Sequence, residues 1–213
     1  MDFSEARRRM VDGQLRPNRV TDPRLVEAML TLPRESFVPA AMAPRAMADA
    51  DLPLGGGRVM LQPMHLARLI QLLALRRGER ALVAPSGTGY EVAVLAAMGA
   101  SVTGIENEER LIALGRALLP PFARVESADP AAGWSAGAPY DAILVPGAVS
   151  RIPATLEEQL AEGGRLATVL MRPGRVPVAV TGMKSGGRVA YADAFDCMTA
   201  PLPEAARPGF VLT

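Results

Sequence analysis

The stretch "ALVAPSGTGYEVAVLA", residues 81–96, decides the fold expected of this chain. An apolar run stops at Pro85 and Ser86, turns through Gly87-Thr88-Gly89 and resumes with the three-to-four residue spacing of a helix. This order is typical of a nucleotide-binding strand, loop and helix. The two glycines would let a ligand approach the backbone, and the amides that open the helix would attract its polar groups.

Two acidic residues follow the next two predicted strands. Glu106 ends "SVTGIE" and Asp129 ends "ARVESAD". A carboxylate at Glu106 would accept hydrogen bonds from ribose hydroxyls, or it would only cap the following helix. The loop lacks the third glycine of the dinucleotide motif, and no Lys-Ser or Lys-Thr pair completes a P-loop. Loop and carboxylates together fit an adenosine ligand without phosphates.

From Glu79 onward, predicted strands and helices alternate, which favours a doubly wound α/β fold with a mostly parallel sheet. The predicted strands are 80–84, 101–106, 123–129, 140–147, 165–171, 176–183 and 188–195, and the predicted helices among them are 90–98, 108–119 and 153–164. We expect one domain, residues 1–213, in three parts. These are N-terminal helices with a glycine-rich loop at 52–63 (1–78), a cofactor-binding core (79–170) and C-terminal strands (171–213).

Composition excludes several classes of function. The formal net charge is +1, from 23 basic and 22 acidic residues, so no long-range attraction to nucleic acid or an anionic membrane is expected. The single cysteine, Cys197, and the single histidine, His65, argue against a disulfide and against a metal site. Without a leader at Met1-Asp2-Phe3 or an apolar run of about 20 residues, we expect a cytoplasmic protein.

Several segments resemble the protein-L-isoaspartate O-methyltransferases, which use S-adenosylmethionine (SAM) to methylate isoaspartyl residues in damaged proteins. The resemblance runs from residue 10 to about residue 170 and rests on "MVDGQL", "VTDPRLVEAMLTLPRESFVP", "LPLGGG", "GTGYEVAVLA", "GIE" and "GWSAGAPYDAILV". It implies a Rossmann-like methyltransferase sheet with an N-terminal helical extension and C-terminal antiparallel strands.

The resemblance also implies roles for the residues that match the family motifs. Gly87 and Gly89 would lie against the methionine part of SAM, Glu106 would bind its ribose hydroxyls, and Asp129 would sit beside its adenine. Ser86 and Thr88 belong to the same loop and would contact the cofactor or serve the structure alone. The segment 52–63 would lie over the methyl group and receive an isoaspartyl peptide, protein or small acceptor through Val59, Leu61 and Gln62.

Three departures from the family pattern fall within these motifs. Val83-Ala84-Pro85 stands where the family reads Glu-Ile-Gly, which is expected to weaken SAM binding. Val59-Met60-Leu61 replaces Thr-Ile-Ser, and Pro130 replaces a glycine. An isoaspartyl carboxylate, with a pKa of about 4, needs no general base, so no catalytic residue is assigned. Loss of both hydroxyls leaves open a changed acceptor, or a non-catalytic relative that binds SAM, S-adenosylhomocysteine or a protein partner.

Overall fold

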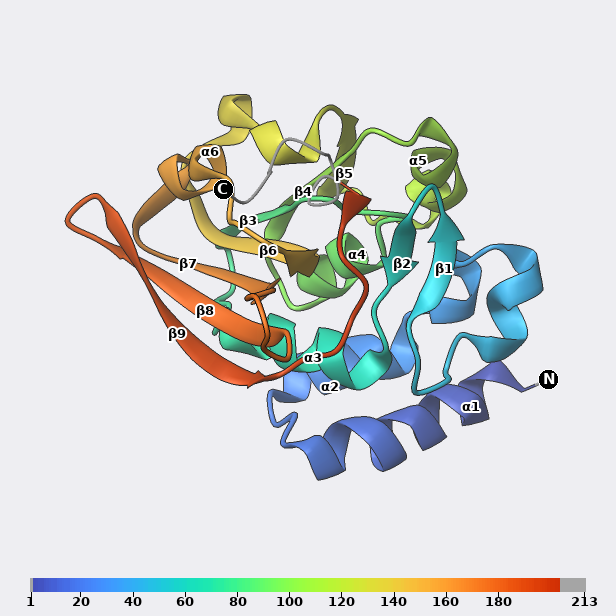
Figure 1. The fold of residues 1–213 in the computed structure, drawn as a ribbon. Coiled ribbons are helices and arrows are strands. Elements are labelled where there is room, and N and C mark those ends of the chain that lie inside the picture. The colour runs from blue at the N-terminus through green and yellow to red at the C-terminus, as the bar shows by residue number, and fades with distance from the viewer. Residues whose placement is uncertain (1, 204–213) are drawn as a thin grey trace.

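A seven-stranded sheet forms the centre of the computed structural model, which describes residues 2–203 (Figure 1). The strand order is β5-β4-β3-β6-β7-β8-β9. β5 through β7 are parallel, whereas β8 and β9 are antiparallel to their neighbours. The strands are β3 (Arg80–Val83), β4 (Ser101–Glu106), β5 (Ala123–Ser127), β6 (Tyr140–Val149), β7 (Leu160–Leu170), β8 (Val178–Ser185) and β9 (Arg188–Asp196). The predicted α/β class, with C-terminal antiparallel strands, is confirmed.

Six α-helices accompany the sheet in the described part of the chain (Figure 1). They are α1 (Phe3–Met10), α2 (Pro23–Thr31), α3 (Pro63–Leu72), α4 (Tyr90–Ala97), α5 (Glu109–Gly115) and α6 (Ala154–Glu158). The first two begin at aspartate caps, since Asp2 accepts from two backbone N–H groups of α1 and Asp22 accepts from one of α2. Shorter 3-10 or π turns lie at residues 11–15, 16–18, 34–37, 40–45, 116–118, 130–132 and 135–137.

Apolar side chains cover both faces of the central parallel strands, as such strands require. Along β3, Ala81 and Val83 belong to the core cluster that includes α2, α3 and α4, whereas Leu82 belongs to the cluster with α6. Because β3 and β6 are adjacent while the chain winds outward from them in opposite directions, the sheet has its topological switch point there. The loops that follow these strands therefore form the crevice in which such folds bind ligands.

The predicted loop at 52–63 is wrong over residues 52–60, where β1 (Leu52–Gly55) and β2 (Arg58–Met60) form an antiparallel hairpin. Gly55, Gly56 and Gly57 all have positive φ, at 90°, 59° and 75°. Glycine adopts these angles without the penalty of a Cβ, so three in a row make a tight turn possible. We call residues 52–60 the covering hairpin.

The predicted helix at 153–164 is also wrong in its second half, because α6 ends at Glu158 and residues 160–164 belong to β7. A Cβ on Gly164 would lie 2.8 Å from the carbonyl oxygen of Ala161 and 3.0 Å from that of Tyr140. Gly164 therefore permits close strand pairing with β6, and neither Gly163 nor Gly164 ends a helix. The predicted helix at 108–119 likewise stops at Gly115 and continues as a 3-10 turn.

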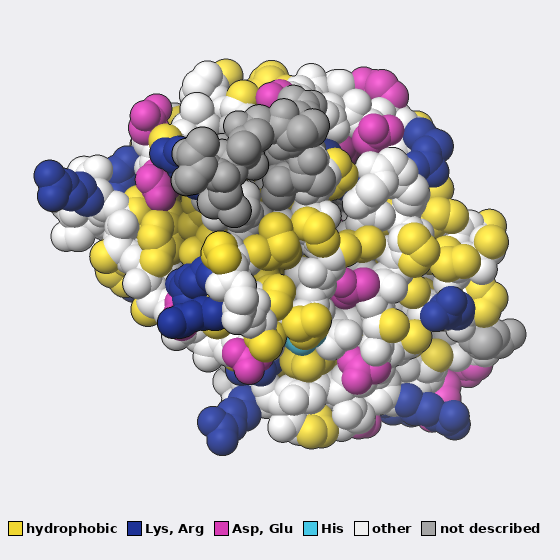
Figure 2. All heavy atoms as spheres, viewed as in Figure 1, with side chains coloured by type: hydrophobic (Ala, Val, Ile, Leu, Met, Phe, Trp, Pro, Cys, Tyr) yellow, Lys and Arg dark blue, Asp and Glu magenta, His cyan; other side chains and the backbone are white. Residues whose placement is uncertain are grey.

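Acidic and basic side chains are interspersed on the face shown in Figure 2 and form no single basic patch there. Hydrophobic side chains gather in a band across the middle of that face, over the covering hairpin. Within residues 2–203, no helix is both long and apolar enough to cross a bilayer.

Candidate cofactor site

The glycine loop leaves β3 at the carboxyl edge of the sheet and enters α4. The backbone N–H of Gly89 donates to the Ser86 carbonyl at 2.7 Å, which closes a tight turn. Gly87 and Gly89 have φ values of +52° and +86°. Residues other than glycine rarely adopt these backbone angles. The carbonyl of Thr88 lies so close to Gly115 of α5 that a Cβ there would meet it at 1.6 Å. Glycines thus fix both the loop and the helix behind it.

Glu106, at the end of β4, is the hub of the site. Its side chain is fully buried and accepts hydrogen bonds from the backbone N–H groups of Gly87 at 2.9 Å, Asn107 at 2.9 Å and Glu108 at 3.2 Å. Hydrogen bonds to an ionised carboxylate are stronger than those between neutral groups. The carboxylate therefore joins the glycine loop to the start of α5.

The covering hairpin supplies the counter-charge for this carboxylate. The Arg58 guanidinium, with a side chain 3% exposed, approaches Glu106 through Nε at 3.2 and 3.3 Å and through Nη2 at 3.2 Å. Arg58 Nη2 also donates to the Asn107 side chain at 3.0 Å. Removing water from both charges is costly and is offset here by their attraction and by the surrounding donors.

The other predicted cofactor residues lie at the same sheet edge in different environments. Ser86 and Thr88 are buried, and their hydroxyl oxygens have no hydrogen-bond partner among residues 2–203. Asp129 is exposed, and its carboxylate accepts from the Ala131 N–H at 3.0 Å, which caps the 3-10 turn that follows β5. The structure thus brings Ser86, Gly87 and Glu106 together, whereas Asp129 lies at the outer end of the row.

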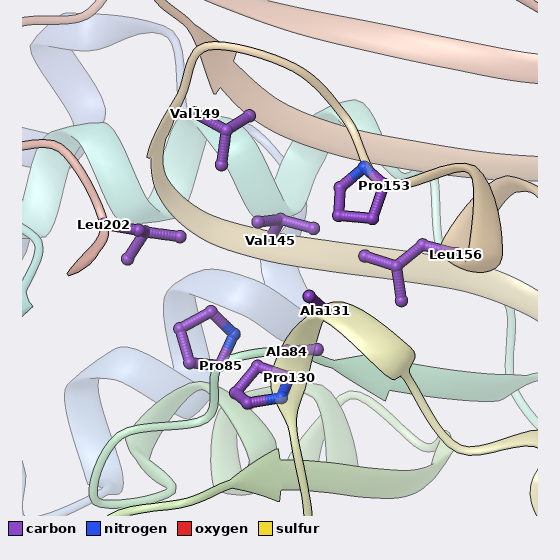
Figure 3. Close-up of a pocket in the computed structure, with 9 residues that line it drawn as sticks. All are labelled: Ala84, Pro85, Pro130, Ala131, Val145, Val149, Pro153, Leu156 and Leu202. Carbon is purple, nitrogen blue, oxygen red and sulfur yellow. The ribbon is translucent and has the colours of Figure 1, made fainter. Parts of the chain in front are cut away.

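Two small cavities lie beside these groups among the described residues. One cavity of about 10 Å³ lies beside Arg58, Ser86, Gly87 and Glu91, which is at the lower limit for a single water molecule. A second, of about 30 Å³, is lined by apolar side chains from the ends of β3 and β6, the turn after β5, α6 and Leu202 (Figure 3). Pockets that enclose a whole cofactor measure roughly 300 Å³ or more.

The predicted substrate residues separate into two groups. Val59, half-buried, lines the smaller cavity with Glu91. Leu61 is fully buried in the core, and its carbonyl accepts a hydrogen bond from the buried Arg34 at 2.6 Å. The backbone N–H of Gln62 donates to Asp51 at 2.8 Å at the start of α3. Of these three predicted residues, Val59 alone lines a cavity next to the glycine loop.

Glu91 is a buried acid in the first turn of α4, with 4% of its surface exposed. Burial, which disfavours the charged form, raises the pKa of Glu91 to about 7. A group with this pKa is partly protonated at neutral pH, so it can donate as well as accept a hydrogen bond. No group of three or more potential metal ligands occurs within residues 2–203.

Sequence reasoning assigned no role to Arg58 or Glu91, although a signal existed for the arginine. In an antiparallel hairpin, residues at spacing two share a face. Arg58 and Met60 therefore point the same way, and both are buried. A charge on the face of a strand that buries a methionine must have a partner. The partner itself is 48 residues away and could not be identified from local pattern.

Strand order, the positive-φ glycine loop and the acid at the end of β4 define the class as a Rossmann-like α/β fold with a ligand site at its switch point. The family model described as protein-L-isoaspartate(D-aspartate) O-methyltransferase (PCMT) matches residues 6–205. The chain belongs to this family, as the sequence motifs predicted.

Individual relatives agree with this assignment. A protein-L-isoaspartate O-methyltransferase of Methylorubrum populi is 45% identical over 172 residues, covering 79% of this chain and 81% of the relative. One from Koribacter versatilis is 37% identical and covers 94% of this chain and 91% of the relative. A Plasmodium falciparum structure described as a protein-L-isoaspartate O-methyltransferase, in complex with S-adenosyl-L-homocysteine, superposes with a TM-score of 0.75 at 20% identity. It covers 92% of this chain and 97% of that one.

SAM is the cofactor of this family, and the residue types at the sheet edge suit it. The covering hairpin lies close to two of these residues, Gly87 and Glu106. The Cβ position of Gly87 faces Leu54 Cδ1 at 3.2 Å, and Arg58 engages both oxygens of Glu106. The two cavities that residues 2–203 line beside the glycine loop, of about 10 and 30 Å³, are too small for a complete cofactor.

Proposed function

We propose that the chain is a SAM-dependent methyltransferase that methylates the side-chain carboxylate of isoaspartyl residues in damaged peptides or proteins. The observation that carries this proposal is the family match over residues 6–205. Gly87, Gly89 and Glu106, which the sequence assigned to the cofactor, support it because they occupy one edge of the sheet at the switch point. Asp129 is proposed to lie beside the adenine.

Methylation of a carboxylate requires little acid-base catalysis from the protein. An isoaspartyl carboxylate, with a pKa of about 4, is already an ionised nucleophile at neutral pH. The protein must orient one of its oxygens toward the methyl donor and keep water away, and such positioning supplies a large share of the barrier reduction. No residue of the chain is therefore required as a general base.

Positioning of the acceptor is proposed to fall to the wall formed by Val59 and Glu91. Val59 provides an apolar side without the hydroxyl that the family pattern carries. Glu91 lines the same cavity, and in its protonated form it can donate a hydrogen bond to an acceptor carboxylate. Leu61 and Gln62 support this wall from the core and from the start of α3.

Methyl transfer to an isoaspartyl peptide, measured against the same peptide with a normal aspartyl residue, tests the proposed activity. We expect methyl ester formation on the isoaspartyl peptide alone. Calorimetric titration with S-adenosylhomocysteine in parallel measures cofactor binding. Binding without transfer to the peptide would point to another small acceptor or to a non-catalytic role, and absence of binding would reject the methyltransferase proposal.

A cytoplasmic location without nucleic-acid partners is proposed on composition. The near-balanced charge gives no attraction to polyanions, and a single cysteine suits a reducing compartment. Cell fractionation and a gel-shift assay with RNA and DNA test these two statements.

A further inference from the structure

Arg58 takes the position on Glu106 that a ribose would need. Along β2, Arg58 is paired with Gly55 and lies on the buried face with Met60. Its guanidinium contacts both carboxylate oxygens of Glu106, at 3.2 and 3.3 Å. No solvent reaches the carboxylate, because Glu106 is 0% exposed. A ligand can therefore bind Glu106 only if some present partner leaves.

The partners of Glu106 differ in how readily they can leave. Three are backbone N–H groups, from Gly87, Asn107 and Glu108, and these belong to the loop and helix that define the site. A carboxylate offers about four lone-pair positions, so these three donors leave room for one more strong interaction. Arg58 fills that room from a separate segment. It is therefore the exchangeable partner.

The rest of the covering hairpin supports the same closed arrangement. Leu54 lies against Gly87, and the cavity that remains beside Arg58 holds about 10 Å³. The hairpin turn rests on α5, where Arg110 donates to the Leu54 carbonyl at 3.0 Å. These contacts hold the hairpin over the loop, while Arg58 alone of the hairpin residues bonds Glu106 among residues 2–203.

We propose that Arg58 is an internal competitor of the cofactor: it holds the ribose-binding carboxylate of Glu106 in a closed state, and SAM binds only after Arg58 and the covering hairpin move away. The proposal rests on the proposed function, because it takes SAM as the ligand. When the competent state is a minor one, the apparent dissociation constant rises by the inverse of its population. Removing the competitor therefore tightens binding without adding any contact to the ligand.

Calorimetric titration of the full-length protein with S-adenosylhomocysteine tests this gate in three proteins: wild type, Arg58→Ala and Arg110→Ala. Arg110→Ala is the matched control, because it loosens the same hairpin without touching Glu106. We expect at least tenfold tighter binding for Arg58→Ala and less than a threefold change for Arg110→Ala. Circular dichroism melting verifies that each variant folds. Arg58→Gln, which lacks the charge but keeps hydrogen-bonding groups, gives the same test if Arg58→Ala does not fold.

The outcomes separate the gate from the proposed function. Equal or weaker binding by a folded Arg58 variant, with measurable binding by wild type, overturns the gate and leaves the methyltransferase proposal standing. Equal tightening by Arg58→Ala and Arg110→Ala assigns the barrier to the hairpin as a whole and overturns the role of Arg58. If neither wild type nor any folded variant binds S-adenosylhomocysteine, the gate and the proposed function both fail.

Discussion

The glycine loop and the covering hairpin meet at Glu106 and hold it in different ways. The loop contributes backbone N–H groups fixed by the positive φ of Gly87 and by the packing of Thr88 against Gly115. The hairpin contributes one long side chain, Arg58, from a two-stranded ribbon with a three-glycine turn. Two-stranded ribbons are marginally stable alone, so the hairpin depends on what it covers.

This difference shows how a cofactor site can be altered without loss of its fold. The family departures at Val83 and Pro85 lie on the loop side, where Val83 is a buried β3 residue paired with Gly104 and Leu144. Val83 packs in the core, whereas Pro85 lines the small cavities beside the glycine loop. On the hairpin side, the proposed gate assigns access to Glu106 to one side chain, Arg58. The loop side of the site is held by backbone geometry, whereas the hairpin side depends on one side chain.

The strongest test of the comparison removes the group that both sides share. Glu106→Ala should lower the free energy of unfolding by about 3–5 kcal/mol, because it breaks a buried ion pair and removes the acceptor of three backbone N–H groups. Urea denaturation monitored by circular dichroism measures this loss. The double variant Arg58→Met/Glu106→Leu removes both charges and should lose markedly less. A double variant as unstable as Glu106→Ala would mean that the ion pair is not the cause.

A second substitution attacks the loop side alone. Gly115→Ala should cost about 3 kcal/mol, near the upper end for overpacking, because the new Cβ would overlap the Thr88 carbonyl at 1.6 Å. Gly13→Ala is the matched control, since it also lies in a helical turn and no atom lies within 4 Å of its Cβ position. Thermal melting of both variants provides the measurement. Similar losses in the two would show that packing on the loop is not tight.

A third test varies the pH and concerns Glu91, which lines the small cavity between the glycine loop and the covering hairpin. The folded pKa of Glu91, about 7, is raised above its ordinary 4.5, so its contribution to stability is full below pH 4.5 and is lost as pH rises through 7. Relative to wild type, Glu91→Gln should therefore gain on the order of 2 kcal/mol between pH 5 and pH 8.

Urea denaturation of both proteins at the two pH values measures that gain. Subtracting the wild-type stability from that of Glu91→Gln at each pH cancels the contribution of Asp22 and Glu79, which changes with pH in the opposite direction. The pKa values of both carboxyls are lowered by an arginine partner and by backbone N–H donors. Glu108→Gln is a control beside the same site. A difference between wild type and Glu91→Gln that stays constant with pH would show that Glu91 does not titrate in this range.

Local sequence patterns were sufficient to predict those parts of the site that one continuous stretch of backbone forms. Positive φ at Gly87 and Gly89, and an acid at the end of β4, follow from a strand, a tight turn and a helix. The covering hairpin was predicted as a loop because three glycines mask the alternation of two very short strands. Its stability comes from packing against residues far along the chain, which local patterns do not contain.

The roles of individual side chains were less predictable for the same reason. Leu61 was expected at the substrate, yet its side chain is in the core, because the α3 start and the buried Arg34 fix the backbone beside it. Arg58 acquires its role from Glu106, which is distant in sequence and adjacent in space. Strand ends can be located from periodicity, whereas the pairing of two buried charges needs the fold.

The smallest expected effect on stability belongs to Asp129, at the exposed end of the row. Asp129→Ala removes a cap on a short turn and should cost about 1 kcal/mol or less. Asp129→Asn keeps a side-chain oxygen for that cap, so it should be closer to wild type in melting temperature.

If Asp129 also contacts the adenine, both variants should weaken S-adenosylhomocysteine binding by removing its charge, even though Asn preserves the turn. Calorimetry in the wild-type and Arg58→Ala backgrounds separates the two roles: unchanged affinity of Asp129→Asn in both would leave Asp129 as a structural cap alone. Its exposure then explains the contrast with Glu106, since an exposed carboxylate needs no counter-charge from the hairpin.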